Sequence, residues 1–166
     1  MSLVVFVTGT NTGVGKTILT ALLLVHLRSR GIRALAMKPV ETGGRRDARL
    51  LHTLQRDEMS LDETNPFWFR KSLAPAIAAR HSGRCLLKTD VLKQVRTLRN
   101  RCDLLLLEGA GGLLSPLGNN RSGLDLVKAL KAKVVVAARN ELGVINHARL
   151  TMDRLCSERI MPQALV

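Results

Sequence analysis

Apolar and polar residues in the first third of the chain alternate between strand-like and helix-like spacing. Residues 3–8 are a short β-branched apolar run that ends at Gly9, which is typical of a buried strand. A second apolar run ends at Pro39, and the segment between the two carries apolar residues at helical spacing. The pattern predicts strands over 3–8 and 33–38, helices over 17–28 and 47–55, and a polar loop over 41–46.

The same alternation continues through the rest of the chain. Residues 56–84 contain several prolines and predict only a short helix over 75–81, whereas Thr89 is a candidate N-cap for a helix with Val91 and Val95 on one face. The remaining pattern predicts strands over 103–108, 133–138 and 163–166 and helices over 124–130 and 144–157. Such alternation favours one α/β domain over residues 1–166, a parallel sheet with helices on both faces.

Length and composition fit this prediction. The 166 residues suit one domain, and 46% of them are apolar, enough to fill a core. No apolar stretch approaches the roughly 18–20 residues that cross a bilayer, and the first residues lack the basic leader of a signal peptide. Cys85, Cys102 and Cys156 are too scattered for a disulfide framework, and we expect them to be small buried residues. We therefore expect a cytoplasmic protein without a membrane segment.

The net charge favours an anionic ligand. Lys and Arg number 26 against 13 for Asp and Glu, which gives +13, and mean hydropathy is near zero at +0.08. Such an excess attracts nucleic acid, acidic lipid or small anions such as nucleoside triphosphates. Aromatic residues make up only 2% of the chain and Tyr is absent, which disfavours a nucleic-acid binder that stacks bases on aromatic rings.

The glycine-rich segment from Gly9 to Thr17 identifies that anion as a phosphate. It connects a predicted buried strand to the start of a predicted helix, and its glycines allow backbone N–H groups to turn inward around phosphate oxygens. Lys16 is placed to reach the β- and γ-phosphates of a nucleotide, and the Thr17 hydroxyl to bind Mg²⁺. Five residues separate Gly9 from Gly15, one more than the usual pattern has.

Two acidic residues are candidates to complete a metal site with Thr17. Glu108 ends a predicted buried strand, and strand carboxyl ends face the ligand crevice in open α/β sheets. Asp47 is either a metal ligand or the N-cap of its helix, and spacing does not decide between the two. Lys38, at the end of the second strand, is either a solvated lysine or a second cation over a transferring phosphoryl group.

Four ordered segments together resemble the dethiobiotin synthetase family. They are Val7-Thr8-Gly9-Thr10-Asn11-Thr12-Gly13-Val14-Gly15-Lys16-Thr17, Met37-Lys38-Pro39-Val40-Glu41-Thr42-Gly43, Leu107-Glu108-Gly109-Ala110-Gly111-Gly112 and Leu142-Gly143-Val144-Ile145-Asn146-His147-Ala148. The resemblance covers nearly all of the chain, and the five-residue spacing in the glycine loop is the family's own variant. It implies a P-loop NTPase-type parallel sheet with helices on both faces. It also implies an ATP- and Mg²⁺-dependent ligase that closes the ureido ring of dethiobiotin from 7,8-diaminopelargonic acid and CO₂.

The resemblance also assigns roles to single residues. Lys16, Lys38 and Thr12 are implied to be catalytic, with Lys38 stabilising the carbamate and the migrating phosphoryl group. Thr12 and Thr42 are implied to bind the carbamate or its amine, and Asn146 the substrate's distant carboxylate across a homodimer interface. The implied nucleotide-binding residues are Gly13, Val14, Gly15, Lys16, Thr17, Glu108 and Gly111, and the implied metal ligands are Thr17, Asp47 and Glu108.

The chain departs from the family pattern in length and charge. Family members continue past the point where this sequence ends, so we expect the last strands and the adenine-binding segments to be missing. Thr42 stands where the family often has Ser, and the basicity is atypical. We attribute most of the charge to arginines on the solvated surface, outside the motifs.

The sequence leaves three alternative functions open. A cobyrinate or cobyrate amidoligase shares the fold but needs a glutaminase domain with a Cys nucleophile. A partitioning-type ATPase carries a lysine five residues before Lys16, where this chain has Asn11. The third is a non-catalytic P-loop domain that binds polyanions through its basic surface.

Overall fold

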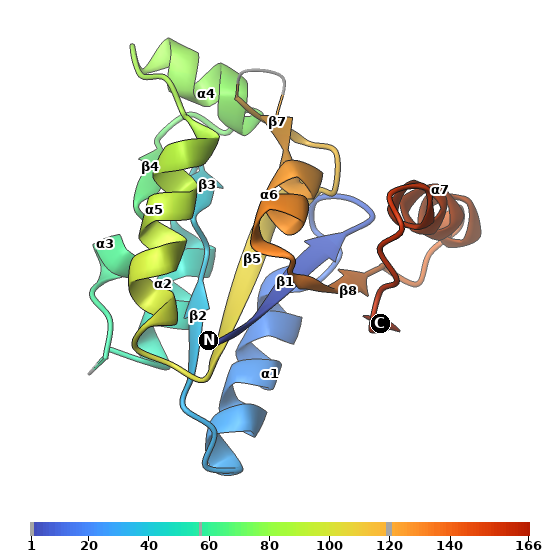
Figure 1. The fold of residues 1–166 in the computed structure, drawn as a ribbon. Coiled ribbons are helices and arrows are strands. Elements are labelled where there is room, and N and C mark those ends of the chain that lie inside the picture. Colours follow the sequence, from blue (N-terminus) through green and yellow to red (C-terminus); the bar gives the residue numbers. More distant parts are fainter. Residues whose placement is uncertain (1, 57, 119–120) are drawn as a thin grey trace.

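A five-stranded sheet, all of whose neighbouring pairs are parallel, forms the centre of the molecule (Figure 1). The structure is a computed structural model that describes residues 2–56, 58–118 and 121–166. In spatial order the strands are β2 (Ala34–Met37), β5 (Leu104–Gly112), β1 (Leu3–Gly9), β8 (Lys133–Ala137) and β9 (Ala164–Leu165). The predicted parallel α/β fold is therefore confirmed, and β1 occupies the middle of the sheet.

Helices cover both faces of this sheet, because successive side chains of a strand point to opposite sides. On one face, Ala36 of β2 and Leu106 of β5 pack with Leu24 of α1 (Lys16–Ser29) and Leu51 of α2 (Arg46–Thr53). On the other face the larger core contains α5 (Lys88–Arg99) and α6 (Gly123–Leu130). Its fully buried members include Phe6, Leu35, Met37, Val95, Leu105, Leu107 and Leu126.

Smaller elements surround the carboxyl ends of the strands. They are α3 (Leu61–Thr64), α4 (Pro75–His81), the parallel pair β3 (Val40–Thr42) and β4 (Phe67–Phe69), and the antiparallel pair β6 (Pro116–Gly118) and β7 (Arg121–Ser122). Ser60 begins α3 with a capping box, in which its side chain accepts from the Glu63 N–H while the Glu63 carboxylate accepts from the Ser60 N–H.

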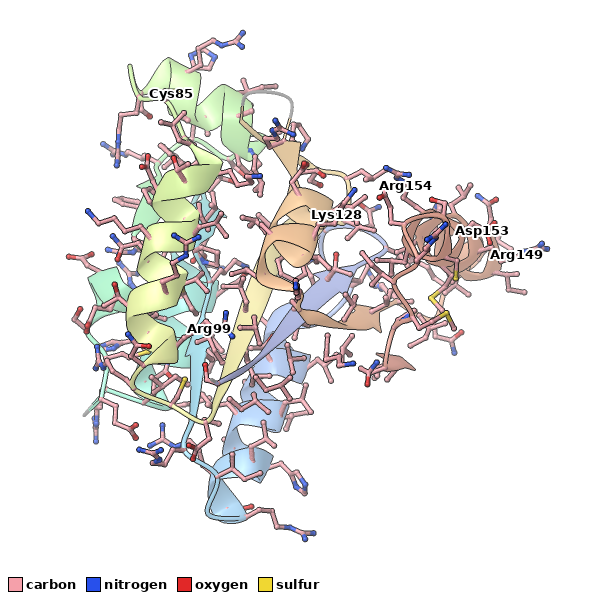
Figure 2. All side chains as sticks on the ribbon, in the orientation of Figure 1. Cys85, Arg99, Lys128, Arg149, Asp153 and Arg154 are labelled. Carbon is pink, nitrogen blue, oxygen red and sulfur yellow. The ribbon has the colours of Figure 1, made fainter. Side chains whose placement is uncertain are left out.

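Helix α7 (Val144–Ser157) lies beside the β8 and β9 edge of the sheet, apart from the other helices (Figure 1). Leu155 is fully buried and holds the end of this helix against the larger core. Glu158 adds a polar link, since its Oε2 lies 2.5 Å from Lys128 Nζ of α6 and its Oε1 lies 2.6 Å from Arg154 Nη2. Figure 2 shows Arg149, Asp153 and Arg154 on this peripheral helix.

The structure confirms most predicted elements and corrects a few. The helices over 75–81 and 144–157 have the predicted bounds. Thr89 is not an N-cap: α5 begins at Lys88 after Leu87, without a side-chain cap. The predicted loop over 41–46 contains part of β3, and β5 continues past Glu108 to Gly112.

Two predictions about single residues also need correction. Cys102 is buried as expected, but Cys85 and Cys156 are exposed. Several surface arginines are not simply solvated, because Arg28, Arg33 and Arg101 pair with acidic side chains and Arg99 donates to the carbonyl of Ser2 at 2.9 Å (Figure 2). In the part of the chain that the structure describes, no helix is long and apolar enough to pass through a membrane.

Candidate functional site

The glycine loop joins the carboxyl end of β1 to the amino end of α1. Gly13 and Gly15 adopt left-handed φ angles of 75° and 93°, a conformation that favours glycine. The loop stays close to the sheet because the Thr10 N–H donates to the carbonyl of Ala137 at 2.9 Å. Lys16 opens α1 and folds back over the loop, where its Nζ donates to the Asn11 carbonyl at 2.8 Å. This arrangement provides backbone donors, a helix N-terminus and an ammonium group for phosphate oxygens.

Burial changes the acidity of the Lys16 ammonium. Only 5% of this residue is exposed, and the loss of solvent, followed by repulsion from the nearby Lys38, lowers its pKa to about 8. The carboxylates of Glu108 and Asp47 act in the opposite direction but do not compensate. Without a bound anion, the Lys16 ammonium is therefore only weakly stabilised.

A buried lysine between two carboxylates lies beside the loop. Lys38 directly follows β2, and Glu108 lies on the neighbouring strand β5, one residue beyond the Met37–Leu107 pair. Lys38 Nζ donates to Glu108 Oε1 at 2.7 Å and also to Asp47 Oδ2, in the first turn of α2. The same Glu108 oxygen accepts from Thr17 Oγ1 at 2.7 Å, which links the lysine to the phosphate loop.

The two carboxylates determine the charge state of Lys38. Burial lowers the pKa of this ammonium, but attraction to Glu108 and Asp47 outweighs that effect and raises the pKa above its usual value. For Asp47, burial raises the pKa of the carboxyl, and Lys38 more than reverses this shift, so that the carboxyl pKa lies below its usual range. Lys38 is thus a fixed cation, suited to stabilising negative charge and not to accepting a proton.

The oxygen atoms around Thr17 fit a magnesium ion. Glu108 Oε2 is buried and has no hydrogen-bond partner among the described residues, and a carboxylate oxygen left in this way fits a cation or its water. Asp47 and the Thr17 hydroxyl lie next to Glu108. Within residues 2–56, 58–118 and 121–166, three or more His, Cys, Asp or Glu side chains nowhere gather as a metal cluster. Hydroxyl and carboxylate oxygens suit Mg²⁺, which keeps waters and phosphate oxygens as most of its ligands.

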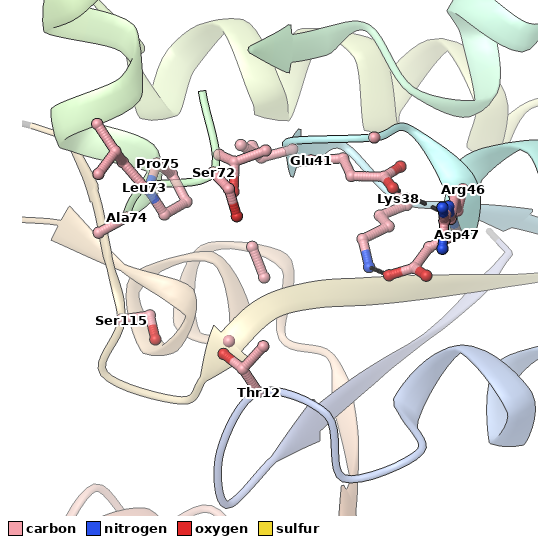
Figure 3. Close-up of a pocket in the computed structure, with 15 residues that line it drawn as sticks. Thr12, Lys38, Glu41, Arg46, Asp47, Ser72, Leu73, Ala74, Pro75 and Ser115 are labelled. Atoms are coloured by element: carbon pink, nitrogen blue, oxygen red, sulfur yellow. Dashed lines mark hydrogen bonds and ion pairs between the residues drawn. The ribbon is translucent and has the colours of Figure 1, made fainter. Parts of the chain in front are cut away.

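Two hollows meet at Lys38. The first, which we call the loop hollow, has a volume of about 400 Å³ and is lined by Gly13, Gly15, Lys16, Thr17 and Glu108 among others. The second, the side hollow, has a volume of about 680 Å³ (Figure 3). Its lining includes Val40, Glu41, Thr42, Ser72, Pro75 and Ser115. Thr12, Lys38, Arg46, Asp47 and Gly111 line both hollows, so these residues surround the junction between them.

The amino end of α2, which carries Asp47, is held by two polar groups. Glu41 on β3 accepts from the N–H groups of Asp47 and Ala48 at 3.1 and 3.0 Å, and burial raises the pKa of its carboxyl. On the other side Arg45, with a left-handed φ of 53°, donates to the side-chain oxygen of buried Asn65 at 3.0 Å. Glu41 and Arg45 therefore fix where α2 begins.

Asn65 connects this helix start to Lys38. Its side-chain amide donates to the Lys38 carbonyl at 2.7 Å, while the Lys38 N–H donates to the carbonyl of Thr64 at 2.9 Å. The Arg45 guanidinium also donates to the Asn65 carbonyl at 2.8 Å and lies over the Trp68 ring, 5.7 Å from its centroid. Through Asn65 the backbone positions of Lys38 and α2 are coupled.

The structure gathers most of the residues that the sequence singled out. Those at the loop and the two hollows are Thr12, Gly13, Gly15, Lys16, Thr17, Lys38, Thr42, Asp47, Glu108 and Gly111. Asp47 lies within the first turn of α2 and is not its N-cap, which is Arg45. Val14 is part of the loop and packs against Gly9, where an added Cβ would meet its Cγ2 at 2.6 Å.

Asn146 is the exception. It lies on exposed α7 and lines a separate hollow with Gly143, Arg149 and Asp153, away from Lys38. Sequence reasoning missed Arg46, Ser72 and Ser115, which line the side hollow. Ser115 carries no motif of its own, but its hydroxyl accepts from the Gly112 N–H at 2.9 Å and could have been sought after the Gly111-Gly112 pair.

A strand, glycine loop and helix followed by a buried lysine–carboxylate cluster at the sheet's carboxyl edge define a P-loop nucleotide-binding α/β protein. A family model described as an AAA domain matches residues 4–166. The ATP-dependent dethiobiotin synthetase of Anaeromyxobacter sp. (strain Fw109-5) is 40% identical over 165 residues, 97% of this chain and 74% of that protein. The enzyme of the same name from Methanocaldococcus jannaschii is 35% identical over 98% of this chain and 78% of its own length. The chain belongs to the dethiobiotin synthetase family.

Solved structures agree on the fold. A signal recognition particle receptor from Elizabethkingia anophelis superposes with a TM-score of 0.55 at 16% identity, covering 99% of this chain and 49% of the receptor. The pNOB8 ParA protein bound to nonspecific DNA gives a TM-score of 0.56 at 14% identity, over 98% of this chain and 62% of ParA. At these identities the likeness shows the P-loop fold alone.

Proposed function

We propose that this chain catalyses the ATP-dependent closure of the dethiobiotin ureido ring from 7,8-diaminopelargonic acid and CO₂. The observation that supports it best is the position of Lys38, a buried cation at the junction of the loop hollow and the side hollow. A nucleotide in the first hollow and an acceptor in the second would meet at this lysine. Membership of the dethiobiotin synthetase family supports the carbamate of diaminopelargonic acid as that acceptor.

The reaction needs three bond-making steps. An amine nitrogen bonds to the carbon of CO₂ and loses a proton, which gives a carbamate. A carbamate oxygen then bonds to the γ-phosphorus of ATP while the bond between that phosphorus and the β,γ-bridging oxygen breaks, and ADP leaves. The second amine finally attacks the carbamate carbon and loses a proton, the C–O bond to phosphate breaks, and phosphate and the cyclic urea are released.

The residues of the site act by position and charge in this scheme. Lys16 and the loop N–H groups hold the phosphates, while Lys38 neutralises charge on the carbamate and on the transferring phosphoryl group. Thr12 and Thr42 line the side hollow and are our candidates to hydrogen-bond the carbamate or its amine. No covalent intermediate with the protein is needed, because aligning two bound reactants already lowers the barrier.

Mg²⁺ belongs to the same proposal. Thr17, Asp47 and Glu108 are the residues that would hold it, as Glu108 Oε2 has no hydrogen-bond partner among the described residues. When bound, the ion neutralises charge on the phosphate oxygens.

Asn146 enters the proposal through a second subunit. Within one chain it lies away from the side hollow, so a role toward the substrate's distant carboxylate requires a homodimer in which the partner's α7 approaches that hollow. We further propose that residues 1–166 act as one P-loop domain and that the enzyme works in the cytoplasm, where ATP is available.

The test is substrate-dependent ADP formation. With ATP, diaminopelargonate, bicarbonate and Mg²⁺, we expect the wild type to form ADP, dethiobiotin and phosphate in equal amounts. Lys16→Ala and Lys38→Ala should each reduce kcat by at least about 100-fold, the effect typical of removing one transition-state stabilising group. Lys93→Ala, which removes an exposed lysine of α5, is the matched control and should be unchanged. ADP formation that does not depend on diaminopelargonate would overturn the proposal.

A further inference from the structure

Arg46 is a cation at the junction of the two hollows for which neither the motifs nor the proposed function has a role. It is the first residue of α2 and lines both the loop hollow and the side hollow. Its side chain is exposed and makes no hydrogen bond or ion pair with any residue that the structure describes. Figure 3 shows it beside Asp47, at the same end of the side hollow as Lys38.

The charges around the junction leave Arg46 as the available cation. The side chains lining the two hollows include three cations, Lys16, Lys38 and Arg46, and three anions, Glu41, Asp47 and Glu108. Lys38 is already paired with two carboxylates, and Lys16 donates to the Asn11 carbonyl. Without Arg46 the lining would carry a net negative charge, which opposes the binding of anionic reactants.

The position of Arg46 is unfavourable for the helix itself. The first turn of a helix favours acidic side chains, and a cation there is disfavoured by the helix dipole. Glu41 and Asp47 supply the favourable charges at this helix start, whereas Arg46 has no local partner that would compensate its placement. Residues that break a local rule in this way are expected at functional positions.

We propose that Arg46 binds the γ-phosphoryl group of ATP as it meets the acceptor at the junction of the two hollows. The planar guanidinium presents paired donors that match two phosphate oxygens. The loop contacts the phosphates that ADP and ATP share, so a group at the junction that contacts the γ-phosphoryl group adds to the discrimination between a triphosphate and a diphosphate. The identity of the acceptor rests on the proposed function, but the contact with the γ-phosphoryl group does not.

Equilibrium binding tests this contact without turnover. The probes are ADP and the β,γ-imido analogue of ATP, each with Mg²⁺ at fixed ionic strength. Arg46→Ala should weaken binding of the analogue about tenfold, or about 1.4 kcal/mol, and change ADP binding less than about twofold. Arg46→Lys should fall between wild type and alanine. Arg49→Ala, which removes an exposed arginine of the same helix that does not line either hollow, should bind both nucleotides like the wild type.

Two results would overturn the proposal. In one, Arg46→Ala binds the analogue like Arg49→Ala. In the other, Arg46→Ala weakens ADP and the analogue equally, which would show a general electrostatic effect and not a γ-phosphoryl contact. Thermal unfolding of each variant checks folding, and removing a cation from the start of α2 should not lower stability. If the wild type lacks diaminopelargonate-dependent turnover but shows this nucleotide discrimination, the proposed function fails and the Arg46 contact stands.

Discussion

Lys16 and Lys38 lie in one site but differ in acidity because their partners differ. Lys38 has two carboxylates within hydrogen-bond reach and an ammonium pKa above its usual value. Lys16 donates to a neutral carbonyl, and burial lowers its pKa to about 8. Lys38 is therefore a permanent cation, whereas Lys16 loses its charge above about pH 8 unless an anion binds next to it.

This difference predicts proton uptake when a nucleotide binds. Below about pH 8 Lys16 is protonated in the free protein, and above that value it is increasingly neutral. Bound phosphate raises its pKa again, so binding at pH 8 should take up about half a proton, and affinity should fall as pH rises further. The measurement is calorimetry of ADP binding without Mg²⁺, in buffers that differ in ionisation enthalpy.

Lys16→Arg provides the control for this prediction. Arginine keeps its charge at any accessible pH, so the variant should bind ADP without taking up a proton at this site. The interpretation would be wrong if the wild type and Lys16→Arg showed the same uptake between pH 7 and pH 9.

At the residue scale, the sequence was informative where chemistry follows from position on an element. Lys16, Lys38 and Glu108 could be predicted to lie together because they belong to the carboxyl side of parallel strands, which meet at one edge. Ser72 could not, because it is brought to the side hollow by packing between segments far apart in the chain. Arg46 and Ser115 carry no motif of their own, although they lie close in sequence to Asp47 and to the Gly111-Gly112 pair.

At the scale of elements, helix α2 acts as the support for one wall of the site. Its start is fixed by Glu41 from β3 and by Arg45, whose guanidinium is bound to Asn65. Asn65 also donates to the Lys38 carbonyl. Displacement of α2, or of the segment after β2 that carries Lys38, therefore changes the contact between Lys38 and Asp47.

Asn65→Ala should therefore affect stability and turnover more than nucleotide binding. The buried amide makes hydrogen bonds with Lys38 and Arg45, and leaving these groups without partners should cost about 1–3 kcal/mol in the free energy of unfolding. We expect a lower kcat with ADP affinity nearly unchanged, because Lys16 and the loop do not contact Asn65. Asn100→Ala, at the exposed end of α5, is the matched control. Equal losses of ADP affinity and kcat in Asn65→Ala would contradict this positioning role.

The elements themselves were predictable to the extent that they carry their own pattern. α7 has a clear apolar spacing, Pro75 marks the start of α4, and both helices have the expected bounds. β3 and β4 have three residues each and were not predicted, because their pairing depends on tertiary contacts and not on local spacing. The prediction of Thr89 as an N-cap is wrong because a threonine within the first turn of a helix gives the same local sequence pattern as a threonine at the N-cap.

At the scale of the whole molecule, α7 is attached to the rest through few buried groups. Leu155 is fully buried, and Ala148 is the other buried residue that this helix contributes. Leu155→Ala should lower the free energy of unfolding by about 2–5 kcal/mol, the range for a leucine that leaves a cavity. Leu150→Ala on the same helix removes a side chain that is 61% exposed, and it should change the free energy of unfolding by less than about 0.5 kcal/mol.

Chemical denaturation at low protein concentration gives both values. A Leu155→Ala variant as stable as Leu150→Ala would show that α7 is not part of the cooperative core. Hydrogen exchange would then be expected to show α7 opening separately from the central strands.

The central place of β1 also determines when, during synthesis, this strand and the glycine loop can reach their final positions. Leu3 pairs with Leu104 and Val5 with Lys133, so β1 is synthesised well before the strands that it pairs with. At about 5–20 residues per second, roughly 100 further residues take about 5–20 s to synthesise. Thr10, which opens the glycine loop, bonds to Ala137 and waits longer still. The nucleotide-binding loop is therefore synthesised well before the strand end that holds it against the sheet.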